Sequence, residues 1–161
     1  MAILDSTQMM FTAFEPKLQN RFLMDIDGIP AYLIKKIDRP NYSANNVTLD
    51  HINTKRKIKG KSVWNPITCE LYDPVTPSGG QAVMEWVRLG HESVTGRDGY
   101  SDFYKKEIRI QTLGPVGDIV EEWILKGAYC TSANFGSMDW SSDAPANISI
   151  TIEMDYAILN F

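Results

Sequence analysis

The end of the chain sets the strongest limit on its fold, because residues 147–158 alternate between apolar and polar side chains. The apolar residues stand at the even positions, which are Ile148, Ile150, Ile152, Met154, Tyr156 and Ile158. Successive side chains of a strand point to opposite faces, so this pattern predicts one strand with a buried face and a wet face. A strand of these twelve residues would span roughly 40 Å and would need partners for its backbone groups. We therefore expect most of the chain to be β-sheet.

The totals fit one soluble globular domain over residues 1–161, large enough to bury a core without metals or disulfides. A net charge of −4 and a pI near 5.1 argue against a protein whose main task is to grip phosphate backbones. Cys69 and Cys130 are predicted to be reduced thiols. Residues 1–14 have no basic signal region, and no apolar run approaches the ~18 residues of a membrane span, so we expect no membrane partner.

Alternating segments separated by turn residues predict the remaining strands. The expected strands cover residues 20–27, 31–39, 63–72, 105–113, 118–129 and 131–140, and a further extended segment starts at residue 47. Turns are expected at Asp27-Gly28 and at residues 114–117, each joining its two flanking strands as a hairpin. Residues 41–46 are expected to form a loop, and residues 1–19 an N-terminal arm held by aromatic anchors.

One helix is expected over residues 81–89, because Val83, Trp86 and Val87 have helical spacing. Ser78 and Gln81 have the spacing of a capping box, and Gly90 is expected to close the helix in the left-handed conformation. About seven to eight strands with one flanking helix predict a mainly β fold. We expect a β-barrel or a two-sheet sandwich with the helix across one opening.

No motif in the sequence favours catalysis. His51 and His91 lack metal-ligand or triad spacing, and residues 25–28 fit a hairpin turn better than a calcium loop. Glu121 and Glu122 would point to opposite faces of a strand, which excludes a shared acid–base pair. We therefore predict no enzyme, no catalytic residues, no cofactor and no metal site.

The most prominent charged feature is a basic run that holds five of the sixteen basic residues. Its members are Lys55, Arg56, Lys57, Lys59 and Lys61. In a strand the four lysines would share one face. The run could bind nucleic acid, protect a sheet edge, or contact acidic residues of a neighbouring subunit. We favour subunit contact, because the interleaved aromatic residues on which single-stranded bases stack are absent.

From about residue 20 to the end, the succession of motifs resembles the tail tube proteins of contractile-tailed bacteriophages and the wider Hcp-like family of contractile injection systems. The matching stretches are residues 55–60 with Trp64, residues 85–86 in the expected helix, and residues 104–106, 122–128 and 150–156. The resemblance does not extend to the N-terminal arm or to the loop at residues 74–80, so family contacts there are not transferred.

This resemblance implies a β-barrel subunit that assembles into homohexameric rings stacked as a hollow tube. Implied partners are further copies of the chain, a tail sheath, a baseplate and a tail terminator, in a virion tail assembled in the host cytoplasm. Viral DNA would pass through the lumen without specific binding, so we expect a neutral or acidic lumen and a basic run at subunit or ring contacts. Two alternatives are an inner tube of a non-phage contractile injection or type VI secretion system, and a monomeric ligand-binding barrel.

Overall fold

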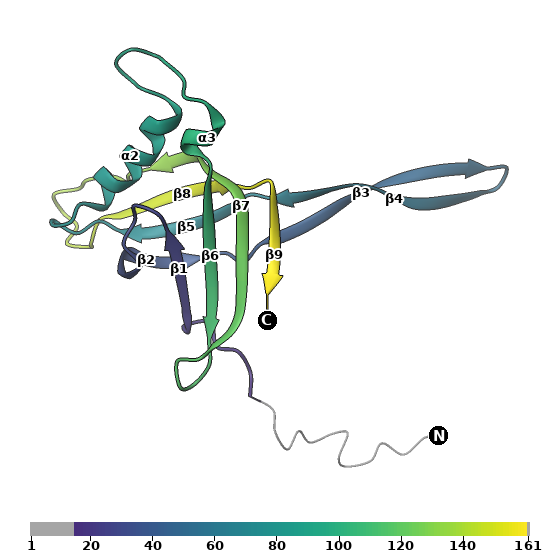
Figure 1. Ribbon diagram of the computed structural model, residues 1–161, viewed down its shortest axis with the longest axis horizontal. Helices are drawn as coiled ribbons and strands as arrows, with labels where there is room; N and C mark the ends of the chain where they lie inside the picture. The colour runs from purple at the N-terminus through teal and green to yellow at the C-terminus, as the bar shows by residue number, and fades with distance from the viewer. Residues whose placement is uncertain (1–14, 161) are drawn as a thin grey trace.

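The structure, a computed structural model, describes residues 15–160 and consists mainly of strands (Figure 1). The strands are β1 Phe22–Ile26, β2 Ile34–Ile37, β3 Asn41–His51, β4 Thr54–Asn65, β5 Ile67–Tyr72, β6 Lys106–Leu113, β7 Ile119–Asn134, β8 Asn147–Glu153 and β9 Tyr156–Asn160. The helices are the 3₁₀ turn η1 Ala31–Leu33, α2 Gly79–Gly90 and α3 Ser101–Tyr104. Most of the predicted N-terminal arm, residues 1–14, lies outside the described residues.

Two antiparallel sheets share strand β7. One contains β1, β6, β7 and β9, and the other contains β2, β5, β8 and the end of β7. In Figure 1 the first sheet runs vertically and the second horizontally across it. The predicted mainly β fold with a flanking helix is therefore confirmed, in the form of two crossing sheets.

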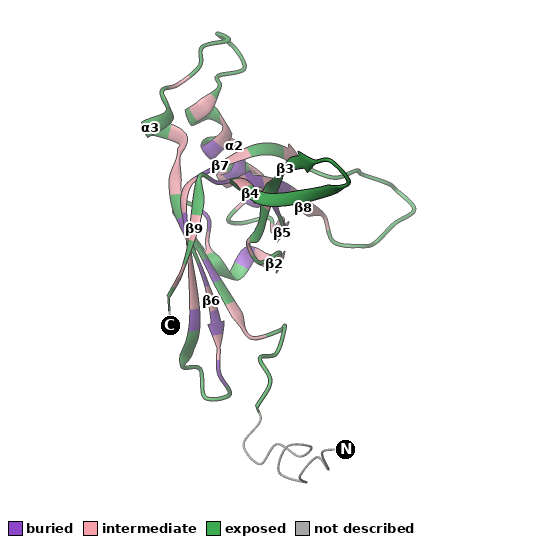
Figure 2. Ribbon diagram, turned by 90° about the vertical axis from the view of Figure 1, so that its right-hand side faces the viewer, coloured by how far each residue is buried: buried purple, intermediate pink, exposed green. Residues whose placement is uncertain are grey.

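The core lies where the inner faces of the two sheets meet (Figure 2). Ile108, Ile110 and Leu125 come from the first sheet, and the second sheet contributes residues of β5 and β8. Val83 and Trp86 add the inner side of α2, and the Trp86 Nε1 donates to the backbone oxygen of Tyr104 at 2.8 Å. The apolar positions that the alternation assigned to one face of β8 are buried in this core.

The predicted single strand over residues 147–158 is wrong, because the chain changes sheets at residues 154–155. Strand β8 pairs with β5 and with the end of β7, whereas β9 pairs with the first part of β7. Tyr156 and Ile158, predicted to be buried, are 49% and 39% exposed. Strand β7 bends at the same level, where Gly127 has a φ of +64° and Asp155 N donates to Lys126 O at 3.0 Å. This bend reverses which positions of the last strand face inward.

The helix agrees with its prediction at its start and departs from it at its end. Ser78 is the N-cap, and its Oγ accepts a hydrogen bond from Gln81 N at 3.4 Å. Gly90 is not in the left-handed conformation. The chain leaves the helix through an extended His91 whose N–H still donates to Val87 O at 3.0 Å.

Three other local predictions are wrong because long-range pairing overrides local preference. Residues 41–46 are not a loop but the start of β3, paired along its length with β4. The turn at Asp27-Gly28 does not join partners, since β1 pairs with β6 and β2 pairs with β5. Residues 131–140 are not a separate strand, because β7 runs on to Asn134. The predicted hairpin of β6 and β7 is confirmed.

Candidate subunit interface

Strands β3 and β4 form a long hairpin, residues 41–65, which we call the hairpin arm. It forms a two-stranded sheet of its own and projects away from the body (Figure 1). A two-stranded hairpin without a packed face is marginally stable in water. The arm is therefore suited to gain a partner surface outside its own chain.

A β-bulge divides the arm and changes the predicted arrangement of its lysines. Ala44 lies opposite Ser62 and Asn46 opposite Lys59, so two steps on β3 match three on β4. Lys55, Lys57 and Lys59 share one face, as predicted. Lys61 does not continue their row, because the extra residue gives Ser62 the place on that face.

The lysine face also carries Tyr42 near the base of the arm. Lys59 Nζ lies 5.5 Å from the centre of the Tyr42 ring, and the Tyr42 hydroxyl lies 2.7 Å from Ser62 Oγ. The nearby Lys59 ammonium and the Ser62 hydroxyl lower the pKa of Tyr42. None of the five predicted basic residues forms an ion pair with another residue in the range 15–160. Apart from Asp50, which lies opposite Lys55, the lysine face of the arm therefore offers these cations no acidic neighbour across the strands.

The opposite face of the arm is apolar, which the sequence analysis did not recognise. Val47 pairs with Ile58, and Leu49 pairs with Arg56 beside them. The three aliphatic side chains are about half exposed, and Ile52 at the tip is fully exposed. Figure 2 colours the outer part of the arm as exposed. The alternation of Val47 and Leu49 was visible in the sequence, but only the pairing places Ile58 and Arg56 on the same face. The arm thus combines an apolar face with a basic one.

Aromatic rings join the arm to the body. Tyr42 packs edge-to-face on Trp64 with ring centroids 5.4 Å apart, and Trp64 packs on Trp123 of β7 at 6.3 Å. The indole N–H of Trp123 donates to Glu121 Oε1 at 2.6 Å. The base of the arm is therefore attached to a fixed position on strand β7.

Glu121 is a buried carboxylate that the sequence analysis missed as a structural site. Its side chain pairs with Lys17, and Arg39 Nη1 lies 3.8 Å from Glu121 Oε1. The Lys17 ammonium, with help from Trp123 and Arg39, lowers the pKa of Glu121 despite its burial. Glu121 and Trp123 stand two positions apart on β7 and share its inner face. Their spacing of two residues was the one sign in the sequence that Glu121 shares a face with an apolar side chain. Glu121 and Glu122 were predicted to point to opposite faces of the strand, and of the two only Glu121 is buried.

The other residues considered in the sequence do not gather into a catalytic site. His91 Nδ1 lies 2.7 Å from Asp98 Oδ1 in the loop after α2, far along the chain from His51 on the arm. Within residues 15–160 no group of three or more potential metal ligands occurs. No helix in that range is long and apolar enough to cross a membrane.

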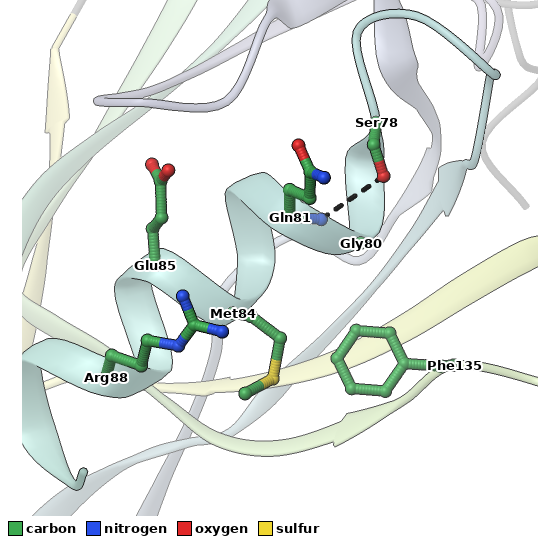
Figure 3. Close-up of a pocket in the computed structure, with 7 residues that line it drawn as sticks. All are labelled: Ser78, Gly80, Gln81, Met84, Glu85, Arg88 and Phe135. Atoms are coloured by element: carbon green, nitrogen blue, oxygen red, sulfur yellow. Dashed lines mark hydrogen bonds between the residues drawn. The ribbon is translucent and has the colours of Figure 1, made fainter. Parts of the chain in front are cut away.

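A pocket of about 450 Å³ lies beside the outer face of α2 (Figure 3). Met84 points toward Phe135 across it, while the carboxylate of Glu85 points away (Figure 3). Its remaining lining residues are Ser78, Gly80, Gln81 and Arg88. This mixture lacks the convergent polar groups of a reaction centre, and the hairpin arm remains the main candidate for function.

Comparison with known proteins gives matches only among solved structures. No protein-family model and no curated protein sequence matches the chain. The structure is similar to the tube terminating cap of the anti-feeding prophage, with a TM-score of 0.75, 18% identity, and coverage of 93% of this chain and 94% of that one.

Two further similar structures come from an extracellular contractile injection system. The PVC sheath/tube terminator has a TM-score of 0.75, 20% identity, and coverage of 93% of this chain and 100% of that one. A chain of the PVC sheath-tube complex has a TM-score of 0.72, 19% identity, and coverage of 99% of both chains. The chain therefore has the fold of tube and terminator proteins of contractile injection systems, which confirms the sequence resemblance at the level of fold.

Proposed function

We propose that the protein is a structural subunit of the hollow tube of a contractile tail or injection machine, not an enzyme. The observation that carries this proposal is the hairpin arm, whose apolar and basic faces beyond its base are exposed and have no packing partner in the described body. A second copy would supply that partner. Repeated head-to-tail contacts close a ring when the rotation between copies fits, and we infer homohexameric rings that stack into the tube.

Sheet edges support assembly as well. Strands β1 and β2 end the path of paired strands, and β9 pairs only with β7. Exposed edges favour pairing with other chains unless they are protected. Pairing between neighbouring copies would satisfy these backbone groups and produce one continuous wall.

The outer face of the second sheet is suitable for lining a lumen. Across β5, β8 and the end of β7 it presents short polar residues, two glutamates and two tyrosines, namely Thr68, Glu70, Tyr72, Tyr129, Ser132, Asn134, Ser149, Thr151 and Glu153. Lys36 of β2 stands opposite Glu70, and Lys35 Nζ lies 5.6 Å from the centre of the Tyr72 ring on the same face, so two lysines balance the two glutamates. A wall that is neutral overall lets a polyanion slide, because it has no excess of cations to hold phosphates. Such a wall favours a phage tail tube that conducts viral DNA as the first candidate.

A tube or tube terminator of a non-phage contractile injection system is the second candidate. It is favoured by the similarity to structures from the anti-feeding prophage and the PVC system. In either form the proposed partners are identical copies, a sheath and a baseplate, in one assembled particle. Particles purified from the native source would distinguish the two, because nuclease-protected DNA is expected in a phage and protein cargo in an injection system.

Sedimentation velocity and negative-stain electron microscopy of the purified protein test the common proposal. We expect concentration-dependent annular or filamentous particles. A species that stays a single chain at every concentration, with or without an added initiator, would contradict assembly and favour the monomeric ligand-binding barrel.

A further inference from the structure

The loop between β7 and β8, residues 135–146, displays a tryptophan outward. Trp140 is fully exposed, and Met138 beside it is nearly so. Asp139 Oδ1 accepts hydrogen bonds from Ser141 N at 3.0 Å and from Ser141 Oγ at 2.9 Å, and Ser142 N donates to Asp139 O at 3.2 Å. The turn therefore holds Trp140 at its corner, away from the body. We call residues 135–146 the Trp140 loop.

The Trp140 loop is acidic as well as apolar. It contains Asp139 and Asp143 and no basic residue. The hydrogen bonds from Ser141 N and Oγ lower the pKa of Asp139. Large exposed apolar side chains with a charged border are typical of protein-binding surfaces.

The outer part of the hairpin arm has the complementary properties. Residues 47–61 contain five basic residues and one acidic residue, a net charge of +4 with His51 neutral. On their apolar face Arg56 stands beside Leu49, next to Val47 and Ile58. An arginine beside aliphatic side chains can receive an indole ring through both apolar contact and cation–π attraction.

We propose that the Trp140 loop of one copy packs on the apolar face of the hairpin arm of a second copy. Trp140 covers Leu49 and Ile58 and stacks on Arg56. Asp139 and Asp143 lie near Arg56, and the lysines of the opposite face add a longer-range attraction. In Figure 1 the arm leaves the right of the body, and the yellow-green Trp140 loop lies at the left. The two surfaces of one chain therefore do not contact each other. A contact between opposite sides is head-to-tail, as a ring or filament requires. This inference rests on the proposed self-assembly and names the surfaces that carry it.

Disulfide trapping between two differently tagged copies tests the contact. One copy carries Leu49→Cys and the other Met138→Cys, both in a Cys130→Ser background, while the buried Cys69 is kept. Mixed under assembly conditions and mildly oxidised, the pair is expected to give a covalent dimer containing one chain of each type. In the matched control, Val116→Cys replaces Met138→Cys. Val116 is an equally exposed apolar residue in the β6–β7 turn, and we expect its variant to give at least tenfold less covalent dimer.

Assembly of Trp140→Ala is the second readout. We expect the monomer to keep its melting temperature, because the side chain is fully exposed, and the concentration needed for assembly to rise at least tenfold. Val116→Ala should assemble normally. Normal assembly of Trp140→Ala together with equal trapping at positions 116 and 138 would overturn this contact and leave the tube proposal standing. A wild-type chain that never self-associates would overturn both.

Discussion

Trp64 of the hairpin arm and Trp123 of the body pack edge-to-face, with ring centroids 6.3 Å apart and an interplanar angle of 72°. Aromatic pairs of this geometry contribute about 0.5–1.5 kcal/mol beyond the area they bury. Because Trp123 is also hydrogen-bonded to the buried Glu121, the arm is attached to a rigid part of β7. We therefore expect the direction in which the arm leaves the body to depend on this pair.

Replacement of Trp64 by Ala should therefore loosen the arm while leaving the body folded. We expect the free energy of unfolding to fall by about 1–3 kcal/mol, less than for a fully buried tryptophan because Trp64 is only half-buried. Hydrogen exchange should accelerate at β3 and β4 and not at β6. Val63→Ala, next to it on the exposed side of the arm, is the control and should change neither quantity appreciably. Unchanged exchange in the arm of Trp64→Ala would show that the stack does not hold it.

Replacement of Glu121 by Gln should destabilise the chain by about 1–3 kcal/mol, because a buried charge-assisted contact with Lys17 and Arg39 is lost. Glu122→Gln is the control, since its half-buried carboxylate lies 3.8 Å from Arg109 at the solvent side. Urea unfolding at pH 7 measures both variants. An equal effect of the two would contradict the assigned importance of the buried carboxylate.

The same carboxylate should make stability depend on acid. The pKa of Glu121 in the folded chain lies below its ordinary value of 4.5, so the unfolded chain takes up the proton first as the pH falls. The stabilisation is therefore fully present above about pH 4.5 and is lost as the pH falls through the folded-state pKa. The stability difference between the wild type and Glu121→Gln should shrink steadily below pH 4.5. A difference that stays constant down to pH 3 would contradict this.

Gly127→Ala should distort the bend that lets β7 pair with strands of both sheets. Gly127 has a positive φ, and an added Cβ would collide with the carboxylate of Asp155, which Lys105 Nζ holds at 3.0 Å. Gly117 also has a positive φ but has open space around it, so Gly117→Ala isolates the backbone cost of about 1–2 kcal/mol. We expect Gly127→Ala to lose at least about 1 kcal/mol more than Gly117→Ala in thermal unfolding. Equal losses would show that the collision is relieved without cost.

Alanine replacement of Lys55, Arg56, Lys57, Lys59 and Lys61 together should block tube growth and leave the monomer folded. These residues have no ion-pair partner among residues 15–160, so their removal costs the single chain little. Electron microscopy and circular dichroism report assembly and folding separately. The variant R88A/R97A removes exposed charges of helix α2 and of the loop after it, outside the arm and the sheet edges, and should still assemble. Normal tubes from the five-residue variant would refute a role of the basic run in subunit contact.

Local patterns predicted the features that depend on neighbours along the chain. The alternation in residues 147–153 matches the burial of β8, and the spacing of Ser78 and Gln81 matches the observed N-cap. The β6–β7 hairpin followed from two alternating segments and a glycine-containing turn. The basic run was recognised, and its first three lysines share a face because an uninterrupted strand has a period of two residues.

The amino-acid order alone determined that this chain forms strands with one wet face, one capped helix and a basic segment, because side-chain periodicity and capping are local. Only the tertiary structure decided that β7 bends at Gly127, that the last strand reverses its faces and that Glu121 is buried between cations. It also decided that a bulge removes Lys61 from the lysine row and that an apolar face lies behind it. Each of these depends on which strand pairs with which and in what register, and pairing between distant segments is decided by the packing of the whole core.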